Sequence, residues 1–209
     1  QYPPETMTFY TTSNLPADLR RESLSFGGSK PGLSNETEAA VCCFLFYRLL
    51  RNYPPEQISI IAPYRKQIRR IRALLSLAHA RRIRPGLASR QWEEFLDSRI
   101  ATVDSFQGSE SDAVIISYVR SNENHVIGFS DNPNRINVAH TRCRKELYIV
   151  GDLECLKRGA GSGIFDQMER AFRRDGRIIL LTEPELKRMQ REIGLKSMEK
   201  VPERACTSI

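Results

Sequence analysis

The chain has 209 residues, of which 40% are hydrophobic and 27% charged, and this balance is typical of a globular protein. Its length suits one domain with a well-covered core. No run of about 18 apolar residues is present, which excludes a transmembrane helix, and no membrane partner is expected. The formal net charge of +7 points instead to an anionic partner.

The five cysteines are odd in number and show no paired CxxC spacing. Neither a zinc site nor a disulfide framework is therefore indicated, and we expect no metal ligands. The beginning of the chain, QYPPETMTFY, also lacks the basic and apolar segments of a signal peptide. These features favour a reducing compartment, which means the cytoplasm or the nucleus.

Basic residues are concentrated in one part of the chain. Between Gln57 and Trp92 no Asp or Glu occurs, and residues 63–91 carry nine Lys or Arg. A solvated helix face is the common explanation of such a run. Solubility alone, however, would permit acidic as well as basic residues in such a stretch. The acid-free stretch therefore favours a surface that faces nucleic acid.

The first half of the chain predicts a strand at residues 7–11, a loop rich in Ser, Gly, Pro and Asn at 12–35 and a helix at 36–52. A fully apolar strand at 58–63 and a helix with one apolar face at 65–80 follow. The first helix has a capping signal, because Ser34 or Asn35 is followed by Glu38. Pro54 and Pro55 end this helix.

The second half predicts strands at residues 99–103 and 113–119, a short helix at 132–143 and a third strand at 145–152. A helix at 163–176, a last strand at 177–182 and a final helix at 183–194 follow. Strands that are apolar on both faces and alternate with helices predict a mostly parallel sheet, which helices cover on both faces. We expect one α/β domain at residues 36–194. Residues 1–35 are expected to form a partial N-terminal strand and loop of the domain, and residues 195–209 a disordered tail.

Polar residues follow or precede several of these strands, after Ala62, after Val103 and before Arg142. In a parallel sheet the strand-to-helix loops meet at the carboxyl edge, so several of these residues are expected there. Arg142 and Arg144 stand between a short helix and a buried strand. Their guanidinium groups offer a planar, always-charged fork that suits phosphate. Taken alone, the pair is better explained as two cations at the end of a helix, where they interact favourably with its dipole.

Three ordered blocks carry a resemblance to a known family: APYRKQ, TVDSFQGSESDAVIISYVRSN and GFSDNPNRINVAHTRCRKELYIVG. The set resembles motifs IV, V and VI of superfamily 1 helicases, in the branch of the mRNA-surveillance (up-frameshift) helicase and senataxin. The resemblance covers residues 35–152. It implies a second RecA-like domain, with the three-layer sandwich of that fold, which binds ATP and single-stranded RNA or DNA together with a first RecA-like domain. ATP with Mg²⁺ would be bound mainly by that first domain.

The resemblance also implies roles for individual residues. Arg142 matches the arginine finger, which stabilises charge that develops during phosphoryl transfer. Gly108 lets the backbone pass close to the ligand, and Glu110 matches the acid near the nucleotide sugar. The nucleotide-binding set is Glu110, Gly108, Gln107, Arg144 and Gln67. The nucleic-acid-binding set is Tyr64, Arg65, Lys66, Arg69, Thr102, Ser105 and Arg120.

Four residues near motif VI are open to a structural interpretation. Cys143 stands where the family has a small apolar residue, and we expect a buried structural thiol. His140 replaces an aliphatic or small residue, and a packed or surface histidine is expected. Arg135 and Asn137 match family positions, but an ion pair or a loop-tying hydrogen bond explains them as well as a substrate contact does.

Parts of a complete motor are missing from this sequence. It has no GxxxxGK[ST] phosphate loop, no acidic Mg²⁺-binding strand motif and no QYRMHP-type motif. We therefore expect a piece of a larger helicase that begins just inside the second domain and does not hydrolyse ATP on its own. The alternative is a non-catalytic nucleic-acid-binding or protein-interaction module derived from such a domain. A dinucleotide-binding enzyme is disfavoured because no GxGxxG follows a strand. RNA is preferred to DNA only because most similar relatives act on RNA.

Overall fold

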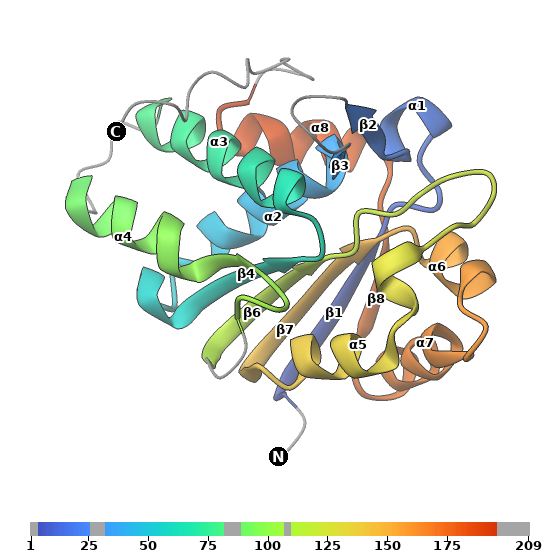
Figure 1. Ribbon diagram of the computed structural model, residues 1–209. Helices are drawn as coiled ribbons and strands as arrows, with labels where there is room; N and C mark the ends of the chain where they lie inside the picture. The colour runs from blue at the N-terminus through green and yellow to red at the C-terminus, as the bar shows by residue number, and fades with distance from the viewer. Residues whose placement is uncertain (1–3, 26–31, 82–88, 107–109, 196–209) are drawn as a thin grey trace.

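The computed structural model describes residues 4–25, 32–81, 89–106 and 110–195. At its centre lies a six-stranded sheet in the order β5-β4-β6-β7-β1-β8 (Figure 1). Every pair of neighbouring strands in it is parallel. The strands are β1 Thr6–Thr11, β4 Ile58–Ala62, β5 Ile100–Thr102, β6 Ser111–Ser117, β7 Cys143–Gly151 and β8 Arg177–Leu180. A second, two-stranded antiparallel sheet pairs β2 Ser23–Ser25 with β3 Gly32–Ser34.

Helices cover both faces of the large sheet, which gives three layers (Figure 1). One face carries α2 Glu36–Leu49, α3 Arg65–Arg81, α4 Ser89–Arg99 and α8 Glu183–Glu192. The other face carries α5 Pro133–His140, α6 Leu153–Gly159 and α7 Ile164–Asp175. Shorter pieces are α1 Ala17–Arg20 and the 3₁₀ turns η1 Pro55–Gln57 and η2 Gly128–Asp131. The predicted α/β three-layer architecture is confirmed.

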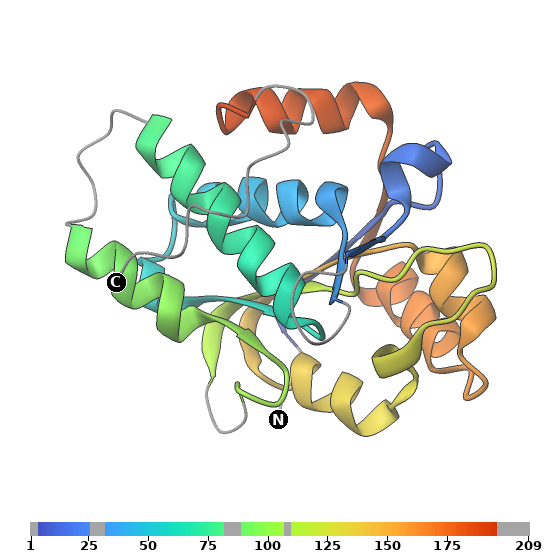
Figure 2. The ribbon, with the colours of Figure 1, turned by 45° about the horizontal axis from the view of Figure 1, so that its top comes forward.

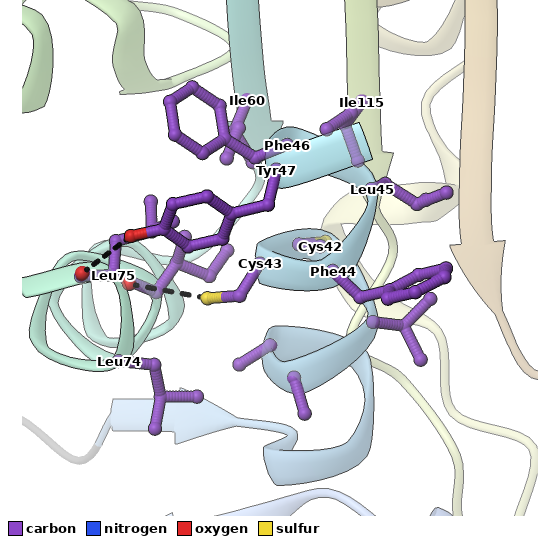
Figure 3. Close-up of a cluster of buried hydrophobic side chains, with 14 of the residues drawn as sticks. Cys42, Cys43, Phe44, Leu45, Phe46, Tyr47, Ile60, Leu74, Leu75 and Ile115 are labelled. Carbon is purple, nitrogen blue, oxygen red and sulfur yellow. Dashed lines mark hydrogen bonds between the residues drawn. The ribbon is translucent and has the colours of Figure 1, made fainter. Parts of the chain in front are cut away.

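Helix α2 is buried nearly all round because it lies between the sheet and the helices α3 and α8. Its side chains fill the first of two cores (Figure 3). Cys43 Sγ donates to the Ile71 carbonyl at 3.8 Å, and Tyr47 Oη donates to the Leu75 carbonyl at 3.4 Å. Phe46 stacks on Phe95 of α4 with ring centroids 4.5 Å apart. This packing ties α2, α3 and α4 into one layer.

Most predicted elements are present, and the differences have identifiable causes. Asn35 is the cap of α2, because its Oδ1 accepts from the Glu38 amide at 3.0 Å. The prediction of a plain loop at 12–35 is wrong, since α1, β2 and β3 lie there. The sequence pattern does not predict helices α4 and α6, because polar residues outnumber apolar ones in α4 and because α6 has only seven residues. The proposed tail falls outside the described residues except for Leu195, and the domain limits stay a prediction.

Among the helices that the structure describes, none is long and apolar enough to cross a membrane.

Candidate nucleotide and nucleic-acid sites

The candidate residues lie at two opposite ends of the sheet. Tyr64 follows β4, Thr102 ends β5 and Arg120 comes soon after β6, so these residues lie at the carboxyl edge. Arg142 and Glu110 directly precede β7 and β6, so they lie at the amino edge. The expectation that several polar loops share the carboxyl edge is confirmed for the first group only.

One face of the sheet connects these two ends. The chain leaves β5 at the carboxyl edge and enters β6 at the amino edge, and Phe106, which lies between them in the sequence, is buried in the second core. Helix α5 lies on the same face. Near the start of α5, Arg135 Nε lies 3.3 Å from Asp104 Oδ1. Just beyond its end, the Ser111 amide donates to the Arg142 carbonyl at 3.0 Å. Both segments therefore connect the two candidate regions.

Helix α5 holds Arg142 at its C-terminal end. The helix begins with Pro133 after the Asn132 cap, whose Oδ1 accepts from the Asn134 and Arg135 amides at 3.0 and 3.3 Å. Arg142 is half-buried and donates from Nε to the Val138 carbonyl at 3.1 Å. This is the contact of a cation with the end of a helix.

The guanidinium of Arg142 keeps donors to spare. Its Nη2 donates to Thr141 Oγ1 at 3.3 Å, and Nη1 makes no hydrogen bond within the described residues. Because the Nε contact fixes the plane of the group, the terminal nitrogens can donate to an incoming anion. A role at the helix end and a role in phosphate binding are therefore compatible for Arg142.

The neighbouring charges differ in how far they are already paired. Arg144 Nε and Lys145 Nζ both lie 2.8 Å from Asp112 oxygens. The hydrogen bond from Lys145, together with the charge of Arg144, lowers the pKa of Asp112. Glu110 is exposed and has no ion pair within the described residues. Gln107 and Gly108 lie outside the described residues.

Gln67 lies in a fully buried polar network. Its Oε1 accepts from the Asn35 amide at 2.8 Å. Its Nε2 donates to the Asn35 carbonyl at 3.2 Å and to Ser117 Oγ at 3.0 Å. The amide therefore joins α2, α3 and β6, and these contacts occupy both of its polar atoms.

Glu38 completes this network and fixes a strained turn. Its Oε2 accepts from Ser117 Oγ at 2.6 Å and from the Val119 amide at 2.8 Å. Val119 has a φ of 73°, and the Arg120 amide donates to the Tyr118 carbonyl at 2.8 Å, as in the rarer, strained form of γ-turn. A β-branched residue in this region is unusual. Burial raises the pKa of the Glu38 carboxyl to about 8.

The turn directs Arg120 toward the two-stranded sheet. Arg120 Nε lies 3.3 Å from Glu22 Oε1, and the Arg120 side chain is only 12% exposed. Thr102 Oγ1 and Ser105 Oγ lie 2.7 Å apart and bond to each other. Arg120, Thr102 and Ser105, which were predicted to contact nucleic acid, therefore have partners within the chain.

The acid-free stretch divides into paired and unpaired cations. Arg70 pairs with Glu36, and Arg72 Nη1 lies 3.1 Å from Asp97 Oδ1. Arg65 and Arg69 are exposed and make no ion pair within the described residues. The stem of Lys66 packs against Gly32.

Two residues near Tyr64 were not assigned to a site from the sequence. The ring of Phe129, on η2, lies 6.1 Å from that of Tyr64, and Arg135 Cζ lies 4.0 Å from the Phe129 centroid. Figure 2 shows the start of α3 and the η2–α5 segment next to each other at this edge. Apolar periodicity cannot reveal an exposed aromatic ring in a turn, so only the nearby motif could have drawn attention to it.

Two further expectations near motif VI, for Cys143 and His140, are confirmed. Cys143 is buried, and burial raises the pKa of its thiol to about 12. His140 packs against Tyr118, with Nε2 and Oη 3.0 Å apart. Burial lowers the pKa of His140 to about 4, so its ring is neutral at pH 7.

Comparison with known proteins identifies the class to which this fold and these sites belong. A family model described as "AAA domain" matches residues 2–154, and the chain belongs to this family. It is 42% identical over 130 residues to the Regulator of nonsense transcripts 1 homolog of Drosophila melanogaster, covering 62% of this chain and 10% of that protein. It is 35% identical over 145 residues to the ATP-dependent helicase upf1 of Schizosaccharomyces pombe, covering 69% and 14%.

A third relative is the DNA polymerase alpha-associated DNA helicase A of Saccharomyces cerevisiae, 37% identical over 107 residues, or 51% of this chain and 14% of that protein. The resemblance to the second RecA-like domain of up-frameshift-type helicases is thereby confirmed. The matched regions are only 10 to 14% of the length of these three relatives.

Proposed function

We propose that this chain acts as the second motor domain of an ATP-dependent nucleic-acid helicase. The observation that supports this most is the pairing of β6 with β7. The Ser111 amide donates to the Arg142 carbonyl at 3.0 Å, so the end of the motif V segment lies beside the motif VI arginine. A parallel pair thus brings Glu110 and Arg142 to one place, although they are far apart in sequence.

The residues at this end suit a nucleotide that is held mainly by another domain. Nη1 of Arg142 would donate to a phosphate oxygen, and the exposed Glu110 carboxylate would accept from sugar hydroxyls. Within the described residues, no group of three or more His, Cys, Asp or Glu could hold a metal. ATP would bring Mg²⁺ with it and supply the phosphoryl group that is transferred. On its own this chain would not hydrolyse ATP.

The other predicted nucleotide contacts would require exchanges of partners. Arg144 would have to leave Asp112, which lies 2.8 Å away. Gln67 would have to give up buried hydrogen bonds to Asn35 and Ser117. Gln107 and Gly108 stay predictions. Arg142 and Glu110 are therefore the residues on which we base the nucleotide site.

Single-stranded nucleic acid would bind along the carboxyl edge. The exposed Arg65 and Arg69, with Lys66 between them, supply the positive charge that phosphates attract. Tyr64, Thr102 and Ser105 contribute hydroxyls at the same edge, and Arg120 would join them by leaving Glu22. We favour RNA as the strand because several relatives are named for nonsense transcripts. A cytoplasmic or nuclear location fits this substrate.

The proposal is tested by the ATP hydrolysis of the full-length protein with and without single strands. We expect stimulation by the strand. Changing Arg65, Lys66 and Arg69 together to Gln should raise the strand concentration needed for half-maximal stimulation about tenfold or more, since three phosphate contacts are lost. Changing the exposed Lys187, Arg188 and Arg191 of α8 to Gln is the matched control and should have little effect. If the full-length protein does not hydrolyse ATP either with or without single strands, the non-catalytic binding module is favoured, and hydrolysis that does not respond to single strands would contradict the proposed motor.

A further inference from the structure

The turn η2 holds an aromatic side chain out of the core. Ile127 and Ser130 on either side of it are 2% and 3% exposed, whereas Phe129 is 42% exposed. Gly128 has a φ of +53°, and a Cβ there would lie 3.1 Å from Tyr64 Oη. The turn is therefore anchored on both sides and fits closely against Tyr64, so the position of Phe129 is well determined.

The ring of Phe129 is also fixed in orientation. Tyr64 meets it edge-on, with centroids 6.1 Å apart and an angle of 64°. The Arg135 guanidinium lies 4.0 Å from the ring centroid and is itself held by Asp104 at 3.3 Å. A single exposed apolar side chain needs no explanation. Arg135 lies over one face of the ring, so a planar ligand would stack on the other face, and a ring that is already held by a tyrosine and a cation loses little entropy on binding.

The charges around this ring favour an anionic, planar ligand. Arg65 directly follows Tyr64, and Arg69 lies one helical turn further along α3; both are exposed. Arg135 adds a third cation, of which Asp104 neutralises part. Aromatic side chains beside a positive groove are the usual platform for single-stranded nucleic acid, because every base has a face that can stack. An apolar protein segment would gain nothing from these three cations.

We propose that Phe129 stacks against a base of the bound single strand, with its ring held in place by Tyr64 and Arg135. This inference rests on the proposed binding of single strands at the carboxyl edge and adds a specific contact to it. Phosphates on either side of that base would meet Arg65 and Arg69. The contact takes any base, so it adds affinity without sequence preference.

The test compares two strands of equal length, one with bases and one made entirely of abasic nucleotides, in binding to the full 209-residue chain. Phe129→Ala should weaken binding of the base-containing strand about 5-fold to 100-fold, as stacking on one aromatic side chain does. It should leave binding of the abasic strand unchanged. The plot of log affinity against log salt should shift in parallel, because no phosphate contact is lost. Phe129→Trp should retain the affinity.

Val126→Ala is the matched control, since Val126 is also apolar, is 54% exposed and lies in the same loop; it should have little effect. Equal loss for both strands, or no loss for either, would overturn the stacking contact while leaving the proposed function intact. A flattened salt slope in Phe129→Ala would likewise contradict it. If the unchanged chain binds neither strand, the proposed function fails and this inference fails with it.

Discussion

At the scale of single residues, Glu38 determines more of the site than its position suggests. It is completely buried at the start of α2, and its Oε2 accepts from Ser117 and Val119. Oε1 of Glu38 has no partner within the described residues. Asn35 Nδ2 donates to the Val119 carbonyl at 3.2 Å, so the cap residue and the first turn of α2 hold both polar backbone groups of Val119. Arg120 owes its direction to this arrangement.

The raised pKa of Glu38 predicts a pH dependence of stability. The folded-state pKa is about 8 because of burial, whereas the ordinary value is near 4.3. Between these values the folded chain binds more protons than the unfolded chain, so stability falls as pH rises. From about pH 5 to about pH 8 this group should lower the free energy of unfolding by on the order of 3 kcal/mol. Urea denaturation at the two pH values measures the change.

Glu38→Gln is the matching variant, because a glutamine resembles the protonated acid and its oxygen can accept the same hydrogen bonds. Its free energy of unfolding should lack the Glu38 contribution, so its change between the two pH values should be smaller by the amount stated above. His140 also contributes, because its lowered pKa reduces stability as pH falls below about 6.5, but it does so equally in both proteins and cancels when their pH dependences are compared. If the free energy of unfolding depends on pH in the same way in both proteins, the raised pKa of Glu38 is contradicted.

At the scale of elements, the loop before η2 is fixed by its contact with α6. A Cβ on Gly159, at the end of α6, would lie 2.2 Å from the His125 carbonyl oxygen and 2.6 Å from Ile127 Cγ2. Cys155 Sγ also donates to the Asn122 carbonyl at 3.7 Å. The loop that leads to Phe129 therefore depends on close packing against this short helix.

Gly159→Ala should destabilise the chain by about 1–3 kcal/mol, because the new methyl group forces the loop away from α6. Gly161→Ala is the matched control: nothing lies within 4 Å of a Cβ there, so its stability should stay close to that of the unchanged chain. Thermal or urea denaturation of both variants measures the difference. Equal free energies of unfolding for the two variants would mean that the loop can move away from α6 without loss of stability.

The elements also show what could be predicted from the sequence. The strands β4 and β6 are mostly apolar and are buried along their whole length, and such segments predict central parallel strands. The left-handed turn at Val119 could not be predicted, because side chains distant in sequence impose it on a residue that disfavours it. The exposure of Phe129 and the pairing of Arg120 with Glu22 are likewise tertiary effects. Motif matching selected the candidate residues but could not distinguish free side chains from paired ones.

At the scale of the whole molecule, the two candidate regions lie at opposite ends of the large sheet. The face that carries α5 connects them. The segment after β5 and helix α5 both lead from the carboxyl edge, with Tyr64 and Phe129, to the amino edge, with Arg142. In the proposed motor, the single strand and ATP would therefore bind at opposite ends of the same two segments.

Arg142 in the full-length protein tests the proposed motor most directly. An arginine finger acts in the transition state, so Arg142→Ala should lower kcat on the order of 10³-fold while KM for ATP changes much less. Arg142→Lys should restore little, because an ammonium lacks the planar fork. Arg173→Ala, at an exposed arginine of α7, is the control. If Arg142 is only a cation at the end of α5, its loss would cost at most about 1 kcal/mol of stability. A nearly normal kcat in folded Arg142→Ala would contradict the proposed role.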